Sequence, residues 1–331
     1  MKTKDTVLAE LSKQQNSNTF ISGQELASLC GISRQAVWKA VKSLQKDGAK
    51  IQAITNKGYR LENSNALISE DAILSLISKS LGVKVFVYDT IDSTNSEAKR
   101  MCADSNNIRS LNGTVLIAKT QTAGRGRVGR KFYSQANTGI YLSIIYSPDE
   151  YITSPAILTA LAAVGVCRSI FSVYGIQSKI KWVNDIFIND KKVCGILTEG
   201  ISNFETGLIE CAIVGIGVNI LPSNMPEEIA SLAGSVLTDA NADTKRNELA
   251  ASIISNILSM YASKNFSSLM NEYRERSLLI NKTVNVFPIA GNTLMSYKAK
   301  VVEITDDAKL VVTTKNGQKK ILESGEVSIA L

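Results

Sequence analysis

The spacing of hydrophobic positions changes twice along the chain. Within residues 1–62, apolar side chains recur at helical intervals, as Val37 and Val41 do on one helical face. Across residues 67–273, short apolar runs typical of strands alternate with longer segments of helical spacing. After Asn281 every apolar run is short. The pattern therefore predicts a helical N-terminal segment, a mixed α/β middle region and a β-rich end.

The middle region contains four clear patterns. Residues 83–89 and 113–120 are rich in β-branched residues and predict strands, whereas residues 157–174 and 248–261 predict helices. Helices that alternate with strands usually pack on a sheet that the strands form. We therefore expect a mixed α/β domain here.

The C-terminal region predicts a small β-barrel. Asn316-Gly317 is a strong hairpin signal between two of its apolar runs. The runs that predict strands are residues 283–288, 296–305, 309–314 and 321–330. Several short strands joined by turns are typical of a barrel, and we expect an SH3-like one.

Together these patterns predict an α/β (α+β) chain of three domains. The polar stretch Glu62-Asn63-Ser64-Asn65 marks the end of the first domain. The expected bounds are residues 1–64, 65–280 and 281–331.

Composition describes a globular chain with a basic balance. Its 331 residues are 44% hydrophobic, enough for more than one core, and its formal charge of +7 favours an anionic partner such as nucleic acid or phosphate. The longest apolar stretch, residues 156–174, is interrupted by polar residues such as Arg168. The charged N-terminus lacks the apolar segment of a secretory signal. We expect no membrane span and a cytoplasmic location.

Two residue types restrict the available chemistry. The chain has no histidine, which excludes His-based catalytic triads and His-ligated zinc sites. Its five cysteines are odd in number and far apart, which favours reduced core residues over disulfides or a metal cluster. They are Cys30, Cys102, Cys167, Cys194 and Cys211. We therefore expect no protein-ligated metal and no cysteine nucleophile.

The N-terminal segment has the spacing of a helix-turn-helix motif. A first helix from about Gln24 would end at Cys30, and Gly31 would allow the turn. Ser33 would then cap a second helix that begins at Arg34. Such a second helix commonly reads the major groove of DNA.

A wing follows this motif. Residues 49–61 predict two short strands around Asn56-Lys57-Gly58, as in a winged helix-turn-helix domain. Polar and basic side chains of the second helix and the wing would face phosphates and base edges. The expected DNA contacts are Ser33, Arg34, Gln35, Lys39, Lys42 and Lys57. The alternative is a helical hairpin with an ordinary solvated basic face.

A glycine- and arginine-rich segment, residues 121–133, provides the second basic region. Glycine lets the backbone approach a ligand closely, and arginine supplies forked donors for an anion. The segment is neither a P-loop, because GxxxxGK[ST] is absent, nor a dinucleotide fingerprint, which must open a helix after a strand. Alone, it fits a ligand-ordered loop or a disordered nucleic-acid contact equally well.

Four motifs in order decide between these alternatives. They are DSTN at residues 92–95, GRGRxGR at 124–130, KWxND at 181–185 and GIGVN at 215–219. With the N-terminal motif, they resemble biotin protein ligases of the bifunctional biotin operon repressor class over essentially the whole chain. Two positions depart from the family pattern: Phe132 stands where tryptophan is usual, and Val183 where proline is usual.

The resemblance implies a set of site residues. Lys181 and Arg127 would be catalytic, stabilising negative charge as the adenylate forms. The implied biotin and adenylate contacts are Ser93, Thr94, Asn95, Gln121, Arg125, Gly126, Arg127, Phe132, Lys181 and Asn219. Thr94 with Glu97 also fits a helix capping box, so a structural role for Thr94 stays open. Asp185 would either bind magnesium indirectly or brace its strand.

The resemblance also implies a reaction and its partners. Biotin's carboxylate would attack the α-phosphorus of ATP, assisted by Mg²⁺ on the phosphates, and biotinyl-5'-AMP would then acylate a lysine of the biotin carboxyl carrier protein, an acetyl-CoA carboxylase subunit. The adenylate would promote a homodimer that binds operator DNA and represses biotin genes. Three alternatives remain: a metabolite-sensing repressor without ligase activity, a lipoate-attaching enzyme, and a ligase without regulation.

Overall fold

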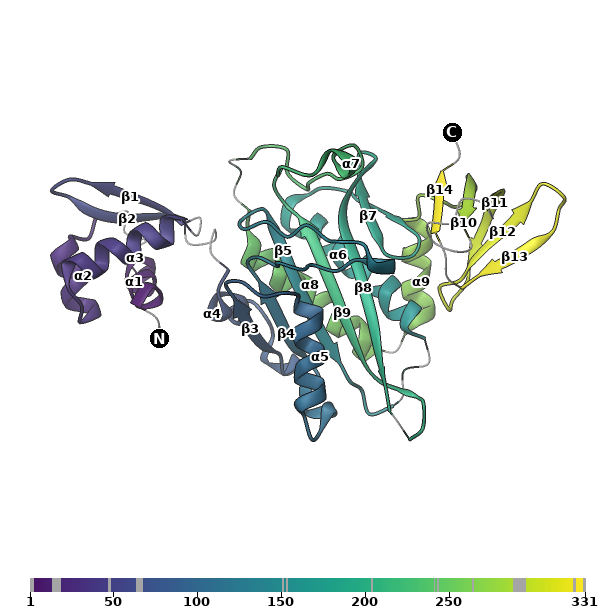
Figure 1. Ribbon diagram of the computed structural model, residues 1–331, viewed down its shortest axis with the longest axis horizontal. Coiled ribbons are helices and arrows are strands. Elements are labelled where there is room, and N and C mark those ends of the chain that lie inside the picture. The colour runs from purple at the N-terminus through teal and green to yellow at the C-terminus, as the bar shows by residue number, and fades with distance from the viewer. Residues whose placement is uncertain are drawn as a thin grey trace. The chain divides into compact units, whose positions relative to one another are not determined.

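The computed structural model divides the chain into two compact units (Figure 1). Unit 1 comprises Met1–Ser69 with Asp243–Asn247, and unit 2 comprises Glu70–Ala242 with Glu248–Leu331. The structure describes residues 3–13, 19–46, 49–63, 68–150, 152, 154–203, 205–240, 242, 244–263, 265–287, 296–323 and 326–329. The expected first domain boundary, between residues 64 and 65, lies outside the described residues.

Unit 1 is a three-helix domain with a hairpin. Its elements are α1 (Thr3–Lys13), α2 (Gly23–Cys30), α3 (Arg34–Lys46), β1 (Lys50–Ile54) and β2 (Gly58–Asn63). Gly31 ends α2 with a φ of 64°, and the Ser33 hydroxyl accepts a hydrogen bond from the Ala36 amide at 3.2 Å. The predicted turn and cap of the helix-turn-helix motif are therefore confirmed. Val37, Val41 and Leu44 lie in the core of the unit, as their spacing predicts.

The hairpin is pinned to the helices through its second strand. Ile21 and Tyr59 exchange two backbone hydrogen bonds, at 2.8 and 2.9 Å. Gly58, with a φ of 109°, leaves no room for a Cβ because the Ile21 carbonyl lies against it. The two-stranded wing is thus packed against the rest of the domain in a fixed position.

Unit 2 is organised around a seven-stranded sheet in the order β3-β4-β5-β9-β8-β7-β6 (Figure 1). Within this sheet only β3 and β4 pair in parallel. Strands and helices alternate along the unit, so the mixed α/β domain predicted from the sequence is confirmed. Its strands are β3 (Lys84–Tyr88), β4 (Thr114–Ala118), β5 (Gly139–Tyr146), β6 (Lys179–Lys181), β7 (Asp185–Ile188), β8 (Lys191–Ser202) and β9 (Ile209–Asn219).

Helices cover both faces of this sheet. Figure 1 shows α5 on the face opposite α6 and α8. The helices of unit 2 are α4 (Glu70–Ser75), α5 (Thr94–Asp104), α6 (Pro155–Tyr174), α7 (Glu227–Ala230), α8 (Arg246–Ser263, whose first two residues fall in unit 1) and α9 (Phe266–Glu275). Short 3-10 helices lie at Lys79–Leu81, Ile108–Leu111 and Arg127–Gly129. Because side chains alternate along a strand, the α5 face of β9 carries its odd-numbered residues.

Helix α6 is the most apolar helix of the described chain. It is long and apolar enough to cross a membrane by length and composition alone, but 67% of the apolar window is buried inside the protein. Gly165 lets α6 approach α8, and the Tyr261 hydroxyl donates to the Leu158 carbonyl at 2.7 Å. The helix thus serves as a core helix of unit 2.

The C-terminal end of unit 2 is a five-stranded antiparallel sheet in the order β13-β12-β11-β10-β14. It comprises β10 (Thr283–Phe287), β11 (Tyr297–Ile304), β12 (Leu310–Thr314), β13 (Lys319–Leu322) and β14 (Glu326–Ile329). The predicted single run at residues 321–330 is wrong, because β13 and β14 pair at opposite edges of the sheet and a continuous strand cannot reach both. A hydrogen bond of 2.7 Å from Trp182 Nε1 to the Ala308 carbonyl joins this sheet to the central one.

The five cysteines are free thiols. Four are buried, and Cys30 is partly exposed. The expectation that the cysteines are core residues is confirmed for the four buried positions.

The close contact between α6 and α8 predicts the effect of a bulky substitution. In Gly165→Leu, the new Cβ would meet Ile257 Cγ1 at 2.8 Å and Met260 Cε at 2.9 Å. We expect the free energy of unfolding to fall by about 1–3 kcal/mol, measured by urea denaturation with circular dichroism. Ser172→Leu, at an exposed position of the same helix, should change it by less than about 0.5 kcal/mol. Equal effects of the two substitutions would contradict this account.

Candidate active site

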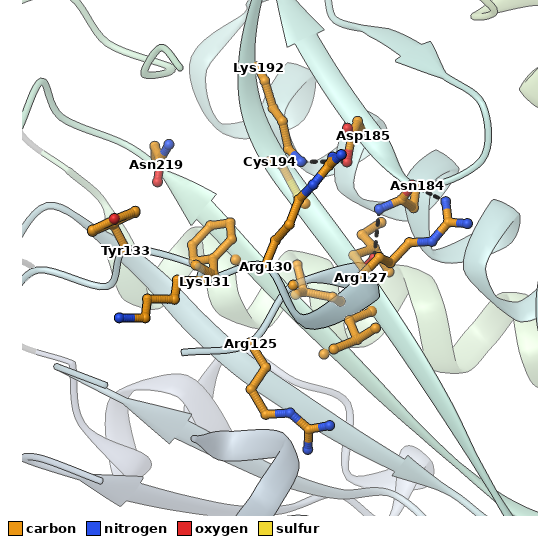
Figure 2. A pocket seen from close by; sticks show the side chains of 18 of the residues that line it. Arg125, Arg127, Arg130, Lys131, Tyr133, Asn184, Asp185, Lys192, Cys194 and Asn219 are labelled. Atoms are coloured by element: carbon orange, nitrogen blue, oxygen red, sulfur yellow. Dashed lines mark hydrogen bonds and ion pairs between the residues drawn. The ribbon is translucent and has the colours of Figure 1, made fainter. Parts of the chain in front are cut away.

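A pocket of about 330 Å³ opens on the α5 face of the central sheet. Its wall is formed by the N-terminus of α5, strands β8 and β9, and the segment Gln121–Tyr133, which we call the arginine loop (Figure 2). The ten ligand contacts expected from the sequence all line it: Ser93, Thr94, Asn95, Gln121, Arg125, Gly126, Arg127, Phe132, Lys181 and Asn219. Four separated segments of the chain therefore meet at one cavity.

The turn that precedes α5 is held by its own side chains. The Ser93 hydroxyl caps the helix by accepting from the Ser96 amide at 3.4 Å, and the Ser93 amide donates to Asp92 Oδ1 at 2.8 Å. Two guanidinium hydrogen bonds from Arg100 lower the pKa of Asp92 to about 2, although partial burial opposes this. Asp92 thus braces the turn as a carboxylate.

Thr94 does not cap the helix. Ser93 occupies the N-cap position, and the Glu97 carboxylate pairs with Arg100, so the capping-box interpretation of Thr94 and Glu97 is wrong. The reason is that α5 begins at Thr94, one residue earlier than that box requires.

Thr94 instead joins a hydrogen-bonded network along the wall. Its amide and hydroxyl both donate to Gln121 Oε1, at 2.8 and 3.2 Å. Gln121 Nε2 donates to the Ser134 hydroxyl at 2.7 Å, and the buried Ser143 hydroxyl lies 2.7 Å from Thr94 Oγ1 and 2.6 Å from Asn95 Oδ1. The network fixes neutral donors and acceptors at the pocket wall before any ligand is bound.

Two glycines of β9 create the space for this wall. A Cβ at Gly215 would collide with the Asn95 side-chain amide, and a Cβ at Gly217 would collide with the Phe132 ring. Phe132 also contacts Tyr141 edge-on, with ring centroids 6.2 Å apart. Phenylalanine thus fills the position of the usual family tryptophan by packing directly on the strand.

The arginine loop is folded by short-range hydrogen bonds. The Gly126 amide donates to the Arg130 carbonyl at 2.7 Å, and the Phe132 amide to the Gly124 carbonyl at 2.9 Å. Val128 lies at the tip with 67% of its surface exposed and a φ of 55°. The loop is therefore a closed turn whose two arms face the pocket.

Its arginines have separate partners. Arg127 Nη1 donates to Asn184 Oδ1 at 2.9 Å, and Arg125 Nη2 donates to Glu199 Oε1 at 2.9 Å. Figure 2 shows Arg130 extending towards Asp185, while Arg125 points the other way. Asn184 is itself fixed, since its Nδ2 donates to the Ile196 carbonyl at 3.0 Å.

Two lysines line the pocket from strands β6 and β8. Lys181 ends β6, with its Nζ 5.8 Å from the centroid of the Phe187 ring. Lys192, near the start of β8, places its Nζ 2.7 Å from Asp185 Oδ1. The buried Trp182 lies beside them, and the Trp182–Val183 peptide bond is cis.

Carboxylates are scarce around the cavity. Among the described residues that line it, Asp185 is the only acidic one. The described part of the chain contains no group of three or more His, Cys, Asp or Glu residues that could hold a metal ion. The walls are consequently cationic and neutral, which suits an anionic ligand.

The far end of the pocket is more apolar. Asn219 is 8% exposed, and its Nδ2 donates to the Gly234 carbonyl at 3.1 Å. Met225, Ile229 and Leu232 line the pocket beyond it. An apolar surface with one fixed amide can hold a flat ring.

Sequence reasoning missed several side chains in or behind the pocket wall, among them Ser134, Ser143, Asn184, Lys192 and Glu199. Asn184 lay within the recognised KWxND motif and was open to prediction. Nothing local distinguishes Lys192 from its exposed neighbour Lys191, because only the register of β8 decides which one faces the pocket.

Unit 1 carries the candidate nucleic-acid interface. The expected DNA contacts Ser33, Arg34, Gln35, Lys39, Lys42 and Lys57 are all exposed. Trp38, on the same side of α3 as Lys42, is 53% exposed and was not anticipated. Arg60 of the wing lies instead against Phe20, 4.8 Å from its ring centroid, and donates to Gln52.

Comparison with known proteins gives matches to both units. Residues 87–219 match the Biotin/lipoate A/B protein ligase family, and residues 6–60 match an HTH domain family. The chain is 34% identical over 324 residues to the "Bifunctional ligase/repressor BirA" of Bacillus subtilis, covering 95% of each protein. It is 26% identical over 270 residues to the protein of the same description from Escherichia coli, covering 81% of each.

Solved structures include similar chains. One is the biotin protein ligase from Aquifex aeolicus in complex with biotin and ATP, with a TM-score of 0.61 and 27% identity. The alignment covers 75% of the present chain and 98% of that ligase.

The contact between Gly217 and Phe132 predicts how the arginine loop is held. In Gly217→Ala, the Phe132 ring must leave its seat on β9. We expect trypsin to cut within the loop roughly tenfold faster, because loss of about 1.4 kcal/mol of local stability raises the open population tenfold. Gly200→Ala, in the neighbouring strand and away from Phe132, is the matched control. Unchanged cleavage in Gly217→Ala would show that Phe132 does not anchor the loop.

Proposed function

Because the chain belongs to the family of bifunctional BirA ligase/repressors, we propose that it activates biotin with ATP, attaches biotin to a carrier-protein lysine, and represses transcription through its winged domain. The observation that carries this function is the meeting of four separated segments at one pocket: residues 92–95, 121–133, 181–185 and 215–219. The pocket supplies neutral groups, cations and an apolar end within one cavity.

Biotin's ureido ring is neutral and carries both donors and acceptors. The network of Thr94, Gln121 and Ser143 offers fixed hydroxyl and amide groups of the same kind. A site built to pair such groups rejects analogues that lack them, because its buried polar atoms would lose their partners. We assign the ureido ring to this part of the wall.

The reaction transfers groups between bound reactants. A biotin carboxylate oxygen attacks the α-phosphorus of ATP, and pyrophosphate leaves. The lysine amine of the carrier then attacks the acyl carbon, and AMP leaves. Neither step requires a covalent intermediate with the protein, which agrees with the absence of histidine from the chain.

Negative charge gathers on the carboxylate and the α-phosphate in the first step. We assign its stabilisation to Arg127, Lys181 and Lys192, which approach the pocket from three elements. Asn184 holds the Arg127 guanidinium in place, so this charge is oriented before the substrate binds.

Adenosine would occupy the apolar end. Met225, Ile229 and Leu232 form a surface for the base, and Asn219 supplies a fixed amide beside it. The Phe132 ring separates this end from the Asn95 side of the wall.

Magnesium fits the site as a companion of ATP. Mg²⁺ binds proteins through one or two carboxylates together with substrate phosphates, and Asp185 is a pocket carboxylate of that kind. When bound, the ion would withdraw charge from the phosphates. Lys192 holds the Asp185 carboxylate in place meanwhile.

The arginine loop has a second role after adenylation. The mixed anhydride is hydrolysed unless the pocket excludes water. The arginine loop covers the pocket wall beside Phe132. We propose that closure of this loop retains the adenylate until the carrier arrives.

The winged domain couples biotin supply to transcription. We propose that the adenylate-bound protein forms a homodimer on a two-fold operator and that the carrier is the biotin carboxyl carrier protein of acetyl-CoA carboxylase. We also propose domain boundaries near residues 64 and 280. The proposed location is the cytoplasm, where ATP and DNA are both present.

A carrier-labelling experiment tests the ligase function. The wild-type protein with biotin, Mg·ATP and a biotin-accepting carrier domain should raise the carrier mass by one biotin. Lys192→Met and Lys181→Ala should each slow labelling on the order of 100-fold or more, because each removes a pocket cation. Lys179→Met, an exposed position on the same strand as Lys181, is the control and should label at the wild-type rate.

The same experiment distinguishes the alternatives. A wild-type protein that binds biotin but never labels the carrier would be a metabolite-sensing repressor. A protein that attaches lipoate to the carrier in preference to biotin would belong to the lipoate-attaching class.

The exposed indole of α3 provides a test of DNA binding. The chain has two tryptophans, and Trp182 is buried, so addition of operator DNA should change the emission of Trp38. Trp38→Ala should weaken operator binding about tenfold through lost apolar contact with base edges. Phe171→Ala, which removes an exposed aromatic ring from unit 2, should leave the affinity unchanged. If the emission of Trp38 did not change at saturating operator concentration, the DNA would not bind at this face of α3.

A further inference from the structure

Glu199 of β8 receives hydrogen bonds from three side chains, two on α5 and one on the arginine loop. Asn95 Nδ2 donates to its Oε2 at 2.8 Å, while Lys99 Nζ and Arg125 Nη2 approach its Oε1 at 2.7 and 2.9 Å. Its side chain is 16% exposed. One carboxylate thus joins α5, the arginine loop and the central sheet.

This carboxylate stays charged. Burial alone would raise the pKa of Glu199, but hydrogen bonds from Lys99 and Asn95, with the charges of Lys99 and Arg125, lower it overall. Two cations and one amide therefore share one negative charge near the pocket wall.

The first consequence concerns Asn95. Its Nδ2 is committed to Glu199 and, at 3.2 Å, to the Leu197 carbonyl, so its Oδ1 must face Ser143. The missing side chain at Gly215 lets this amide lie flat against β9. Because Ser143 also contacts Thr94, the orientation set at Glu199 reaches the network of the pocket wall.

The second consequence concerns the arginine loop. Its arms are anchored by Arg127 on Asn184, by Phe132 on Gly217 and by Arg125 on Glu199. The Glu199 contact is the anchor that directs a guanidinium away from the cavity, as Figure 2 shows for Arg125. Arg125 and Gly126 nevertheless both line the cavity.

We propose that Glu199 is a positioning residue that holds Asn95 and Arg125 in their ligand-binding arrangement and thereby slows release of the biotinyl adenylate. Glu199 is absent from the described residues that line the pocket, so it acts through these two partners. Its loss therefore affects retention of the intermediate more than the rate of chemistry. This inference rests on the proposed ligase function.

Glu199→Gln tests the proposal, because it keeps the size of the side chain and an acceptor for Asn95 while removing the charge. The protein is loaded with biotin and α-labelled ATP, diluted into unlabelled reactants, and followed for release of the adenylate. We expect release about tenfold faster than in the wild type and a raised KM for biotin, with kcat for carrier labelling within about twofold. The thermal midpoint is measured in parallel.

Lys99→Met is the matched control. It removes a different cation from the same carboxylate oxygen but leaves Asn95 and Arg125 paired with Glu199. Release should stay within about twofold of the wild type. A cycle with Arg125→Met completes the test: if Glu199 acts through Arg125, the double variant should release the adenylate no faster than the faster single variant.

The outcomes separate the two levels of inference. The positioning role is overturned if Glu199→Gln releases the adenylate at the wild-type rate or more slowly. A lower kcat with an unchanged KM for biotin also overturns it. A thermal midpoint that falls equally in Lys99→Met and Glu199→Gln, with equal release rates, would assign the carboxylate to stability alone. A wild-type protein that forms no adenylate refutes the ligase function itself.

Discussion

The pocket depends on the close approach of two side chains to a single strand. Strand β9 presents Gly215 and Gly217 on the face that carries α5, and the Asn95 amide and the Phe132 ring occupy the space where Cβ atoms would lie. The first contact seats the N-terminus of α5 on the sheet, and the second seats the C-terminal arm of the arginine loop. Because both lie on one face of one strand, the polar wall and the loop are positioned by the same surface.

Charge is organised around this surface in pairs. Three cations near the pocket each pair with a residue on a different structural element. Arg125 pairs with Glu199, Arg127 with Asn184, and Lys192 with Asp185. Pairing orients these side chains without neutralising the pocket, since the described lining has one carboxylate and several cations. A preorganised cationic site can stabilise charge that develops on phosphorus without help from imidazole, which this chain lacks.

The two activities of the family use separate compact units. The winged domain has its own core, from Val7 to Leu61, and its exposed basic helix does not depend on the pocket for its fold. The proposed coupling between adenylate and DNA binding would require an adenylate that favours one state of the protein over another.

The sequence by itself determined the features that depend on neighbouring residues. Local spacing predicted the Ser33 cap, the Gly31 turn, the Asn56-Lys57-Gly58 hairpin and the alternation of strands with helices. The ordered motifs indicated the family. Only the tertiary structure decided which side chains meet across the sheet. Glu199 lies 104 residues from Asn95 and 74 from Arg125. Thr94 does not cap α5, because the helix begins one residue earlier than its box requires. The physical reason is that turns and caps are set within a few residues, whereas strand register and packing join residues whose separation along the chain leaves no local signal.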